Sequence, residues 1–398
     1  MSEMSYLEKL LDGVEVEWVT LGSMADIGTG SSNRQDESEN GIYPFYVRSK
    51  NILKSDTFEF DEVAIVIPGE GGIGDIFHYV EGKYALHQRA YRIRITTNAV
   101  DTKFLYYFMS SSFKQYILTK SVGATAISIR KPMLEGFKVP IPSPDNPEKS
   151  LAIQSEIVRI LDKFTALTAE LTAELNMRKK QYNYYRDQLL SFKEGEVEWK
   201  SLEDIALFRR GSFPQPYGNS EWYDGEGCMP FVQVADVADS GFTLHTKTKQ
   251  QISKIAQSKS VFVEAGTIVV TLQGTIGRVA ITQYDCYVDR TLAIFTNFKV
   301  KINKKYFAYQ LKAKFDSEKE FARGSTLKTI TKEEFSKFQL PLPSINEQNR
   351  IVSLLDKFDT LAHSIKQGLP REIELRQKQY EYYRDLLFSF PKPETASN

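Results

Sequence analysis

The longest regular pattern of apolar positions runs from about residue 150 to residue 192, a stretch that contains no proline or glycine. Between Leu161 and Phe192 one register alternates spacings of three and four residues, and eight of its ten positions are apolar or aromatic. This spacing predicts a coiled-coil seam rather than a simple amphipathic helix. A continuous helix of about 43 residues would be roughly 65 Å long, because each residue adds about 1.5 Å.

A second helical stretch is expected over about residues 346–390, where the apolar pattern is less regular. The segment Gly368-Leu369-Pro370 interrupts this stretch. We expect a kink or a break at this point, because Pro370 has no backbone N–H and its ring clashes with the preceding turn.

The two helical stretches also differ in length. Asp162 and Tyr182 are 20 residues apart, whereas the matching Asp356 and Tyr380 are 24 residues apart. The difference equals the length of a tetrad, Thr-Ala-Glu-Leu, that occurs twice in succession at 168–175. An inserted tetrad adds about 6 Å and roughly 40° of rotation beyond one turn, so we interpret the helix as a spacer that changes length in steps.

Short strands between turns are predicted before each helical stretch. The clearest are Ile42–Val47, Glu62–Ile67 and Arg89–Ile95, which are rich in β-branched or aromatic residues and are bounded by turn formers. A helix is expected at Lys103–Leu118. In the later part of the chain, the corresponding predictions are a strand at Thr267–Leu272 and a helix at Tyr306–Phe315.

The chain is a tandem repeat of two halves. Glu15–Trp18 recurs as Glu196–Trp199, and the same offset carries Gly30 onto Gly211. Further matching pairs are Val139–Pro142 with Leu340–Pro343, Gln181–Asp187 with Gln379–Asp385, and Gly123–Thr125 with Gly324–Thr326. The expected division is an N-terminal domain at 1–145, a first spacer helix at 146–195, a C-terminal domain at 196–344, a second spacer helix at 345–392 and a tail at 393–398.

These elements predict an α+β fold with two mixed α/β domains separated by two long antiparallel coiled-coil helices. The halves would form a pseudo-twofold tandem repeat. Such an arrangement suits a DNA duplex with two separated half-sites, because the duplex has the same dyad.

Composition changes this picture little. Lys and Arg total 51 and Asp and Glu total 51, so the totals give no sign of a polyanion partner. The net charge is −4 in the first domain, +1 in the first helix, +3 in the second domain and 0 in the second helix with the tail. DNA affinity would therefore depend on local loops and on basic partners. Two cysteines, a charged N-terminus and no apolar run of about 18 residues predict a cytoplasmic protein outside the membrane.

No catalytic constellation or metal-ligand spacing is present in the sequence, and we expect neither a catalytic nor a metal site. Gly69–Gly74 fits the glycine pattern of a dinucleotide-binding loop, but Pro68 precedes it and a strand-like segment, rather than a helix, follows. A tight hairpin or a binding loop is the favoured interpretation.

Several loops combine side chains that can read bases or hold phosphates. Arg can donate to guanine, Gln and Asn to adenine, and Lys and Ser to phosphates. Taken one at a time, each of these residues is better interpreted as a solvated surface residue. As a set in matching turns of both halves, they predict a DNA-binding face. The candidates are Arg48, Lys50, Asn51, Gln88, Arg89, Ser128, Arg130 and Lys131 in the first half, and Arg209, Arg210, Gln215, Gln233, Gln273, Arg278, Arg290 and Lys328 in the second.

The helical stretches carry a second set of candidates. The Tyr-x-Tyr-Tyr-Arg-Asp clusters could stack on bases, but their position on a heptad seam favours packing between helices. The expected spacer and subunit-interface residues are Leu161, Phe164, Leu171, Leu175, Tyr182, Tyr185, Phe358, Tyr380 and Tyr383.

This arrangement resembles the specificity subunit of type I restriction–modification enzymes over nearly the whole chain. The resemblance lies in the repeated Glu-Val-Glu-Trp segments, the paired Val-Pro-Ile-Pro and Leu-Pro-Leu-Pro segments, and Ile157–Phe164, which recurs at Ile351–Phe358. The tandem tetrads look like those of the type IC subgroup. The interrupted second helix departs from the straight spacer of that family.

The resemblance implies that each domain is a target-recognition domain for one half of a bipartite double-stranded DNA site. It implies that the helices set the gap between half-sites and dock two modification subunits. Restriction subunits would join in the full complex. No cofactor is expected on this chain, because the resemblance places S-adenosylmethionine, ATP and Mg on the partner subunits. Two alternatives remain: a nucleotide-dependent enzyme that uses the Gly69–Gly74 loop, and a protein-binding adaptor.

Overall fold

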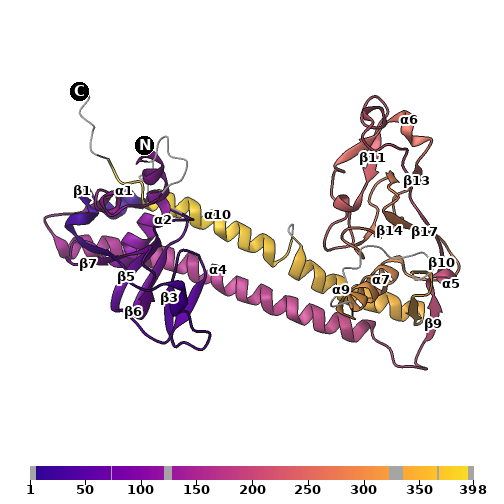
Figure 1. The fold of residues 1–398 in the computed structure, drawn as a ribbon, viewed down its shortest axis with the longest axis horizontal. Coiled ribbons are helices and arrows are strands. Elements are labelled where there is room, and N and C mark those ends of the chain that lie inside the picture. The colour runs from indigo at the N-terminus through magenta and orange to yellow at the C-terminus, as the bar shows by residue number, and fades with distance from the viewer. Residues whose placement is uncertain (1–5, 73, 121–127, 322–334, 365–366, 393–398) are drawn as a thin grey trace. The chain divides into compact units, whose positions relative to one another are not determined.

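The fold was analysed in a computed structural model, which describes residues 6–72, 74–120, 128–321, 335–364 and 367–392. The chain forms two compact units (Figure 1). The first contains residues 1–170 together with 375–398, and the second contains residues 171–374. Each unit therefore combines one of the expected domains with parts of the helical stretches.

The first unit is built on a six-stranded sheet. Its strands follow the order β2-β7-β5-β6-β3-β4, and β3 runs parallel to β6 while the other neighbours are antiparallel. A separate pair, β1 and β8, joins the two ends of the domain. The elements are α1 (Tyr6–Leu11), β1 (Val16–Thr20), η1 (Leu21–Ser23), β2 (Ala25–Thr29), η2 (Arg34–Asp36), β3 (Tyr43–Tyr46), β4 (Ile52–Ser55), β5 (Phe60–Pro68), β6 (His78–Leu86), β7 (Ala90–Ile95), α2 (Thr102–Lys120), α3 (Lys131–Glu135) and β8 (Lys138–Pro142).

The second unit repeats this plan with a divided sheet. Its two four-stranded sheets have the orders β10-β17-β14-β15 and β12-β11-β16-β13, so β13 with β14 replaces β5 and β15 with β16 replaces β6. The elements are β9 (Glu198–Ser201), α5 (Leu202–Ile205), β10 (Ala206–Arg210), η3 (Ser220–Trp222), β11 (Met229–Val232), η4 (Val234–Asp236), β12 (Gln250–Ile252), α6 (Lys254–Gln257), β13 (Val261–Val263), β14 (Ile268–Thr271), β15 (Val279–Ile281), β16 (Cys286–Val288), β17 (Leu292–Phe298), α7 (Lys304–Phe321) and β18 (Gln339–Leu342).

These elements confirm the strands and helices that the sequence predicted. The mixed α/β class is confirmed in both units. In each unit, the main core lies between the sheet and one helix, where Phe104 and Phe113 of α2, or Phe307 and Phe315 of α7, are fully or almost fully buried. The core aromatics are large enough to contribute much of the apolar burial that stabilises each domain.

Two of the segment pairs that marked the sequence repeat form paired strands, whereas Gly123–Thr125 and Gly324–Thr326 lie outside the described residues. Trp18 of β1 lies opposite Pro140 of β8, and Trp199 of β9 lies opposite Pro341 of β18. Each pair is a two-stranded sheet, where proline costs little because a strand has one unpaired side. The chain therefore enters and leaves each domain at neighbouring positions.

A parallel junction is repeated bond for bond in the two units. At the end of β6, the N–H of His87 donates to the carbonyl of Tyr46 at 2.9 Å. At the end of β16, the N–H of Asp289 donates to the carbonyl of Val232 at 3.0 Å. Because β3 and β6, like β11 and β16, run parallel, the loops that follow them leave the sheet at the same edge.

Glycine is required beside both junctions. A Cβ on Gly30 would overlap the carbonyl oxygen of Leu86, and a Cβ on Gly211 would overlap that of Val288. These two glycines are the pair that the sequence repeat aligned. Their close approach lets Ser32 and Ser212, two and one residues later, donate backbone hydrogen bonds to the same carbonyls at 3.2 and 3.1 Å.

The long first helix is confirmed as α4 (Pro147–Leu190), which has 44 residues and is uninterrupted (Figure 1). It begins in the first unit and ends in the second. Nine of the ten seam positions are buried or half-buried, and the tenth, Tyr185, stacks on Phe358 with ring centroids 5.4 Å apart. The heptad pattern therefore identified the face of α4 that packs.

The second helical stretch is divided into α9 (Ile345–His363) and α10 (Leu369–Leu387). The expected interruption at Gly368–Pro370 is confirmed. Pro370 occupies the first turn of α10, where a helix does not need the missing N–H. The predicted range 345–392 therefore contains two helices rather than one.

The two helical stretches pack in an antiparallel manner within the second unit. Tyr182 of α4 contacts His363 of α9, and three residues later Tyr185 contacts Phe358, so the numbering rises on one helix and falls on the other. In the first unit, Phe164 of α4 stacks on Tyr383 of α10 with centroids 5.3 Å apart. Aromatic pairs of this kind favour one register between the helices.

Each domain is attached to its spacer helix by the same polar contacts. Asp162 of α4 accepts hydrogen bonds from Tyr107 Oη at 2.6 Å and Lys103 Nζ at 2.7 Å. Asp356 of α9 accepts a hydrogen bond from the corresponding Tyr309 at 2.9 Å and forms an ion pair with Lys305 at 2.8 Å.

Eight residues earlier on each helix, a buried glutamine completes the attachment. Gln154 Oε1 accepts from the N–H of Asp101 at 2.8 Å, and Gln348 Oε1 accepts from that of Asn303 at 2.9 Å. Both side chains are almost fully buried, at 0% and 1% exposed. Since a buried amide without partners is costly, these glutamines hold the domain in one position on its helix.

Changing Gly30 to Ala should lower the urea midpoint of unfolding, with a cost of about 1–3 kcal/mol or more, because a carbonyl would have to move. Gly28→Ala, two residues earlier in β2, is the matched control, since its Cβ would meet only the side chain of Arg92 at 3.8 Å. Equal midpoints for the two variants would contradict the close-approach argument.

Asp162→Ala should also destabilise the first unit, by about 1–3 kcal/mol, because two donors lose their acceptor. Asp187→Ala on the same helix is the control, because the Asp187 carboxylate is largely exposed and pairs with the adjacent Arg186. Calorimetric scanning of both variants provides the measurement. The attachment would be unimportant if the two transitions coincided with that of the unsubstituted protein.

Candidate nucleic-acid interface

In the first unit, two of the predicted residues bind one carboxylate and two more lie beside them. Arg48 follows β3 and Arg89 follows β6, and each donates through Nη1 to Glu70 Oε2 at 3.1 Å. Glu70 also forms a β-bridge with Ser128. The adjoining Gln88 donates to Asn33 Oδ1 at 2.5 Å, which ties the loop after β2 into the same cluster.

A backbone network holds these loops together. The N–H of Gly69 donates to the carbonyl of Arg89 at 2.9 Å, and the N–H of Ile129 donates to the carbonyl of Gly69 at 2.8 Å. An open groove of about 460 Å³ lies beside the cluster. It is lined by Arg34, Val47, Arg48, Ser49, Asn51, Leu53, Glu70, Gly71 and His87.

The charges of the cluster are well defined. The hydrogen bond from Arg89, followed by that from Arg48, keeps the pKa of Glu70 below its ordinary value, so the carboxylate is ionised at neutral pH. Burial, together with Arg48 and Arg89, lowers the pKa of His87. His87 Nδ1 accepts from the N–H of Arg89 at 3.0 Å, as expected of a neutral imidazole.

The remaining first-half candidates lie at the edge of this cluster or beyond it. Lys50 is exposed on the loop after β3, and Asn51, also exposed, lines the groove. Arg130 is exposed immediately before α3, next to the bonded Ile129. Lys131 lies 3.8 Å from Glu135 on the same helix, so its charge is directed along α3.

In the second unit, the equivalent loops bring together Gln233 and Arg290. Gln233 follows β11, and its backbone N–H donates to Asp236 at 2.8 Å. Arg290 is exposed, and its guanidinium lies 5.0 Å from the ring centroid of Tyr217. Tyr217 in turn donates to the buried Asp289 at 2.5 Å, so the arginine rests on a fixed ring.

The other second-half candidates are less uniformly available. Arg278 pairs with Asp239 and donates to the carbonyl of Val237, so its guanidinium is engaged within the unit. Gln273 is half-buried in the loop between β14 and β15. Arg209, Arg210 and Gln215 are exposed, the two arginines beside a pocket of about 360 Å³. Lys328 lies outside the described residues.

The hairpin interpretation of Gly69–Gly74 agrees with the fold, and the dinucleotide alternative is not supported. This segment lies between β5 and β6, which pair with each other in antiparallel fashion. A pyrophosphate site of that type needs a helix N-terminus directly after the glycines, and a strand follows instead. Residues 69–72 therefore belong to a hairpin connection that carries Glu70.

Sequence reasoning missed several residues of these faces. Asn33, Arg34, Glu70 and His87 all border the first groove or its hydrogen bonds. The available signal was the Gly30–Gly211 match, since the chain that follows these glycines must pass beside the junction. The contacts of Glu70 had no local signal, because its arginines are 22 and 19 residues away.

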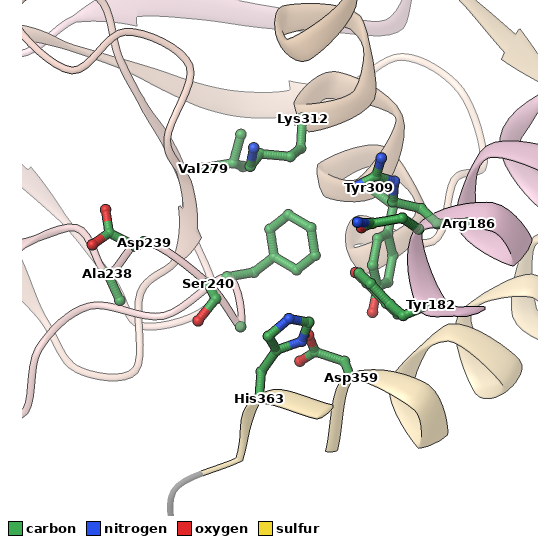
Figure 2. Close-up of a pocket in the computed structure, with 13 residues that line it drawn as sticks. Tyr182, Arg186, Ala238, Asp239, Ser240, Val279, Tyr309, Lys312, Asp359 and His363 are labelled. Carbon is green, nitrogen blue, oxygen red and sulfur yellow. The ribbon is translucent and has the colours of Figure 1, made fainter. Parts of the chain in front are cut away.

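The second unit also has a small pocket of about 160 Å³ where its domain meets the helices (Figure 2). Tyr182, Tyr309 and His363 approach one another from three different helices in this view. Phe242 packs edge-on against Tyr309 with centroids 4.6 Å apart, and His363 Nδ1 lies 3.0 Å from Asp359. Lys312 is paired with Asp316. Because its aromatic side chains pack on one another, we interpret the pocket as a packing junction.

The described residues hold neither a metal-binding cluster nor a membrane-spanning helix. Among them, no group of three or more His, Cys, Asp or Glu side chains is arranged to hold a metal ion. None of the described helices combines the length and apolar character that crossing a membrane requires.

The duplicated fold and its two loop faces belong to a known class of DNA-reading protein. The family model for the type I restriction modification DNA specificity domain matches twice, over residues 13–178 and 194–375. The chain therefore belongs to the type I restriction–modification specificity family.

Two relatives match this chain over all or nearly all of its length. The chain is 40% identical to the type I restriction enzyme EcoR124I/EcoR124II specificity subunit of Escherichia coli, over 100% of both chains. It is 33% identical to the EcoprrI specificity subunit of the same species, over 92% of this chain and 93% of the relative. The first similarity is consistent with the type IC-like tetrads.

Solved structures support the same fold. The S subunit of a type I restriction–modification system from M. genitalium matches with a TM-score of 0.59 and 18% identity, covering 98% of this chain and 100% of that one. The HsdS subunit from Thermoanaerobacter tengcongensis matches with a TM-score of 0.50 and 16% identity, over 94% and 96%. Neither the nucleotide-dependent enzyme nor the adaptor is supported by these similarities.

Proposed function

We propose that each domain of this specificity subunit reads one half of a bipartite site in double-stranded DNA. The observation that carries the proposal is the repeated parallel junction, since His87 and Asp289 make the same backbone bond at the start of the two loop faces. Arg89 and Arg290, which follow them, are exposed and can reach base edges in the major groove. The two domains carry different loops on the same fold, which is what recognition of two half-sites with different base sequences requires.

The helices would set the gap between the half-sites and dock the partner subunits. Tyr184 and Tyr382 occupy equivalent positions in the two helical stretches and are 61% and 65% exposed. Exposed aromatic residues of this kind are common anchors in protein interfaces. Because the anchor occurs once per repeat, we propose two modification subunits, one for each copy.

The chain itself would be non-catalytic. The modification subunits would transfer methyl groups from S-adenosylmethionine to adenine N6, and restriction subunits would use ATP and Mg to cut unmodified DNA. These assignments are carried over from the family, and the working complex would act on DNA in the cytoplasm. With a neutral composition, this chain would rely on those partners for much of the salt-dependent DNA affinity.

Mapping N6-methyladenine across the genome, in cells with and without this chain, tests the proposal directly. We expect methylation at a two-part motif with a fixed gap, which disappears when the chain is absent. The purified chain alone should not bind S-adenosylmethionine in a calorimetric titration. A single contiguous motif, or tight binding of the methyl donor by the isolated chain, would show that the proposal is wrong.

Insertion of a third Thr-Ala-Glu-Leu after Leu175 tests the spacer role. The insertion extends α4 by about 6 Å, so the mapped gap should lengthen while both half-sites keep their sequences. Replacing residues 172–175 by four alanines is the matched control, because it keeps the helix length. Altered half-sites with an unaltered gap would contradict the spacer role.

A further inference from the structure

Glu70 connects two arginines that come from different loops of the first unit. Arg48 lies two residues beyond β3, and Arg89 lies three residues beyond β6. Both donate Nη1 to the same carboxylate oxygen, Oε2. Glu70 itself lies two residues beyond β5, so one side chain links the ends of three strands.

The two guanidinium groups have a spacing that suits stacked bases. Each Nη1 lies 3.1 Å from the same oxygen, so the two nitrogens are within roughly 6 Å, less than two base-pair steps of about 3.4 Å each. Each arginine uses Nη1 for the carboxylate, and its other edge, Nε with Nη2, can donate to guanine O6 and N7.

The cluster is open to a ligand. The side chains of Arg48, Arg89 and Glu70 are 47%, 55% and 40% exposed. The groove of about 460 Å³ beside them includes Val47 and Leu53, which can contact the apolar edges of bases. Exposed ion pairs contribute little to fold stability, so stability does not explain why two arginines converge on one carboxylate.

We propose that Arg48 and Arg89 read guanines at the same or neighbouring positions of the half-site bound by the first domain, and that Glu70 is the positioning residue for both. The inference rests on the proposed function, because it requires that this domain reads DNA. Glu70 holds each guanidinium plane before DNA arrives, so less side-chain freedom is lost on binding.

The corresponding arginines of the second unit are held in a different way. There Arg290 rests on Tyr217, and Arg278 is bound to Asp239 and to the carbonyl of Val237. The guanine preference is therefore assigned to the first half-site alone. This asymmetry makes it possible to test the inference with the second half-site as an internal reference.

The test compares Glu70→Gln with Asp75→Asn. Both variants remove one negative charge from the same connection between β5 and β6, but Asp75 contacts Lys114, at 2.7 Å, rather than an arginine of the cluster. Each variant is assembled with its modification subunits. Affinities are then measured for the mapped cognate duplex, for duplexes with 7-deazaguanine at single guanines, and for an unrelated duplex.

In the unsubstituted complex, loss of N7 at the guanines read by Arg48 or Arg89 should weaken binding about 5- to 150-fold. Glu70→Gln should lose most of that discrimination, while its affinity for the unrelated duplex is unchanged or higher, because the face gains positive charge. Asp75→Asn should keep the discrimination. Equal discrimination in the two variants would overturn the inference.

Two further results keep the test decisive. If Glu70→Gln does not fold, Arg48→Lys and Arg89→Lys replace it, since lysine keeps the charge but lacks the bidentate fork. Both should lose guanine discrimination in one half-site only. If the mapped first half-site lacks a guanine that requires N7, the inference fails while the bipartite function stands; if no bipartite motif is found, the proposed function itself fails.

Discussion

The attachment of each domain to its spacer helix is the interaction on which the remaining structure depends. A buried glutamine and an aspartate eight residues later bind the domain at two points, through Gln154 and Asp162 in one unit and Gln348 and Asp356 in the other. Apolar contacts alone would allow a helix to rotate or slide by one residue, because they have little directional preference. The directional bonds fix the orientation of each domain on its helix. They therefore also fix the direction in which the loop face of that domain points.

Much of the architecture could be predicted from spacing alone. The seam of α4, the interruption before Pro370 and the strands around Glu62–Ile67 all follow from local periodicity or from the chemistry of single residues. The division of the second sheet could not be predicted, because β15 and β16 are separated by Thr282–Asp285, whose conformation is set by tertiary contacts. One such contact is the bond from Thr267 N–H to Thr282 Oγ1 at 3.0 Å.

The candidate interface shows the same limit. Arginine, glutamine and lysine in turns were recognisable, but their partners were not. Arg278 and Arg89 look alike in the sequence, yet one is held by Asp239 and a carbonyl, whereas the other leans on an exposed carboxylate. Long-range pairing decides which arginine keeps a free edge for a base, and a single sequence does not contain that pairing.

The pairing of β1 with β8, and of β9 with β18, has a consequence for how such a protein changes. Because the first and last strands of each domain are neighbours, the whole domain is inserted between two adjacent points of the chain. A recombination event in the flanking segments could replace the whole domain and leave the two strands at the same positions. Evolution could therefore exchange one domain as a cassette, while the helices and the other domain remained unchanged.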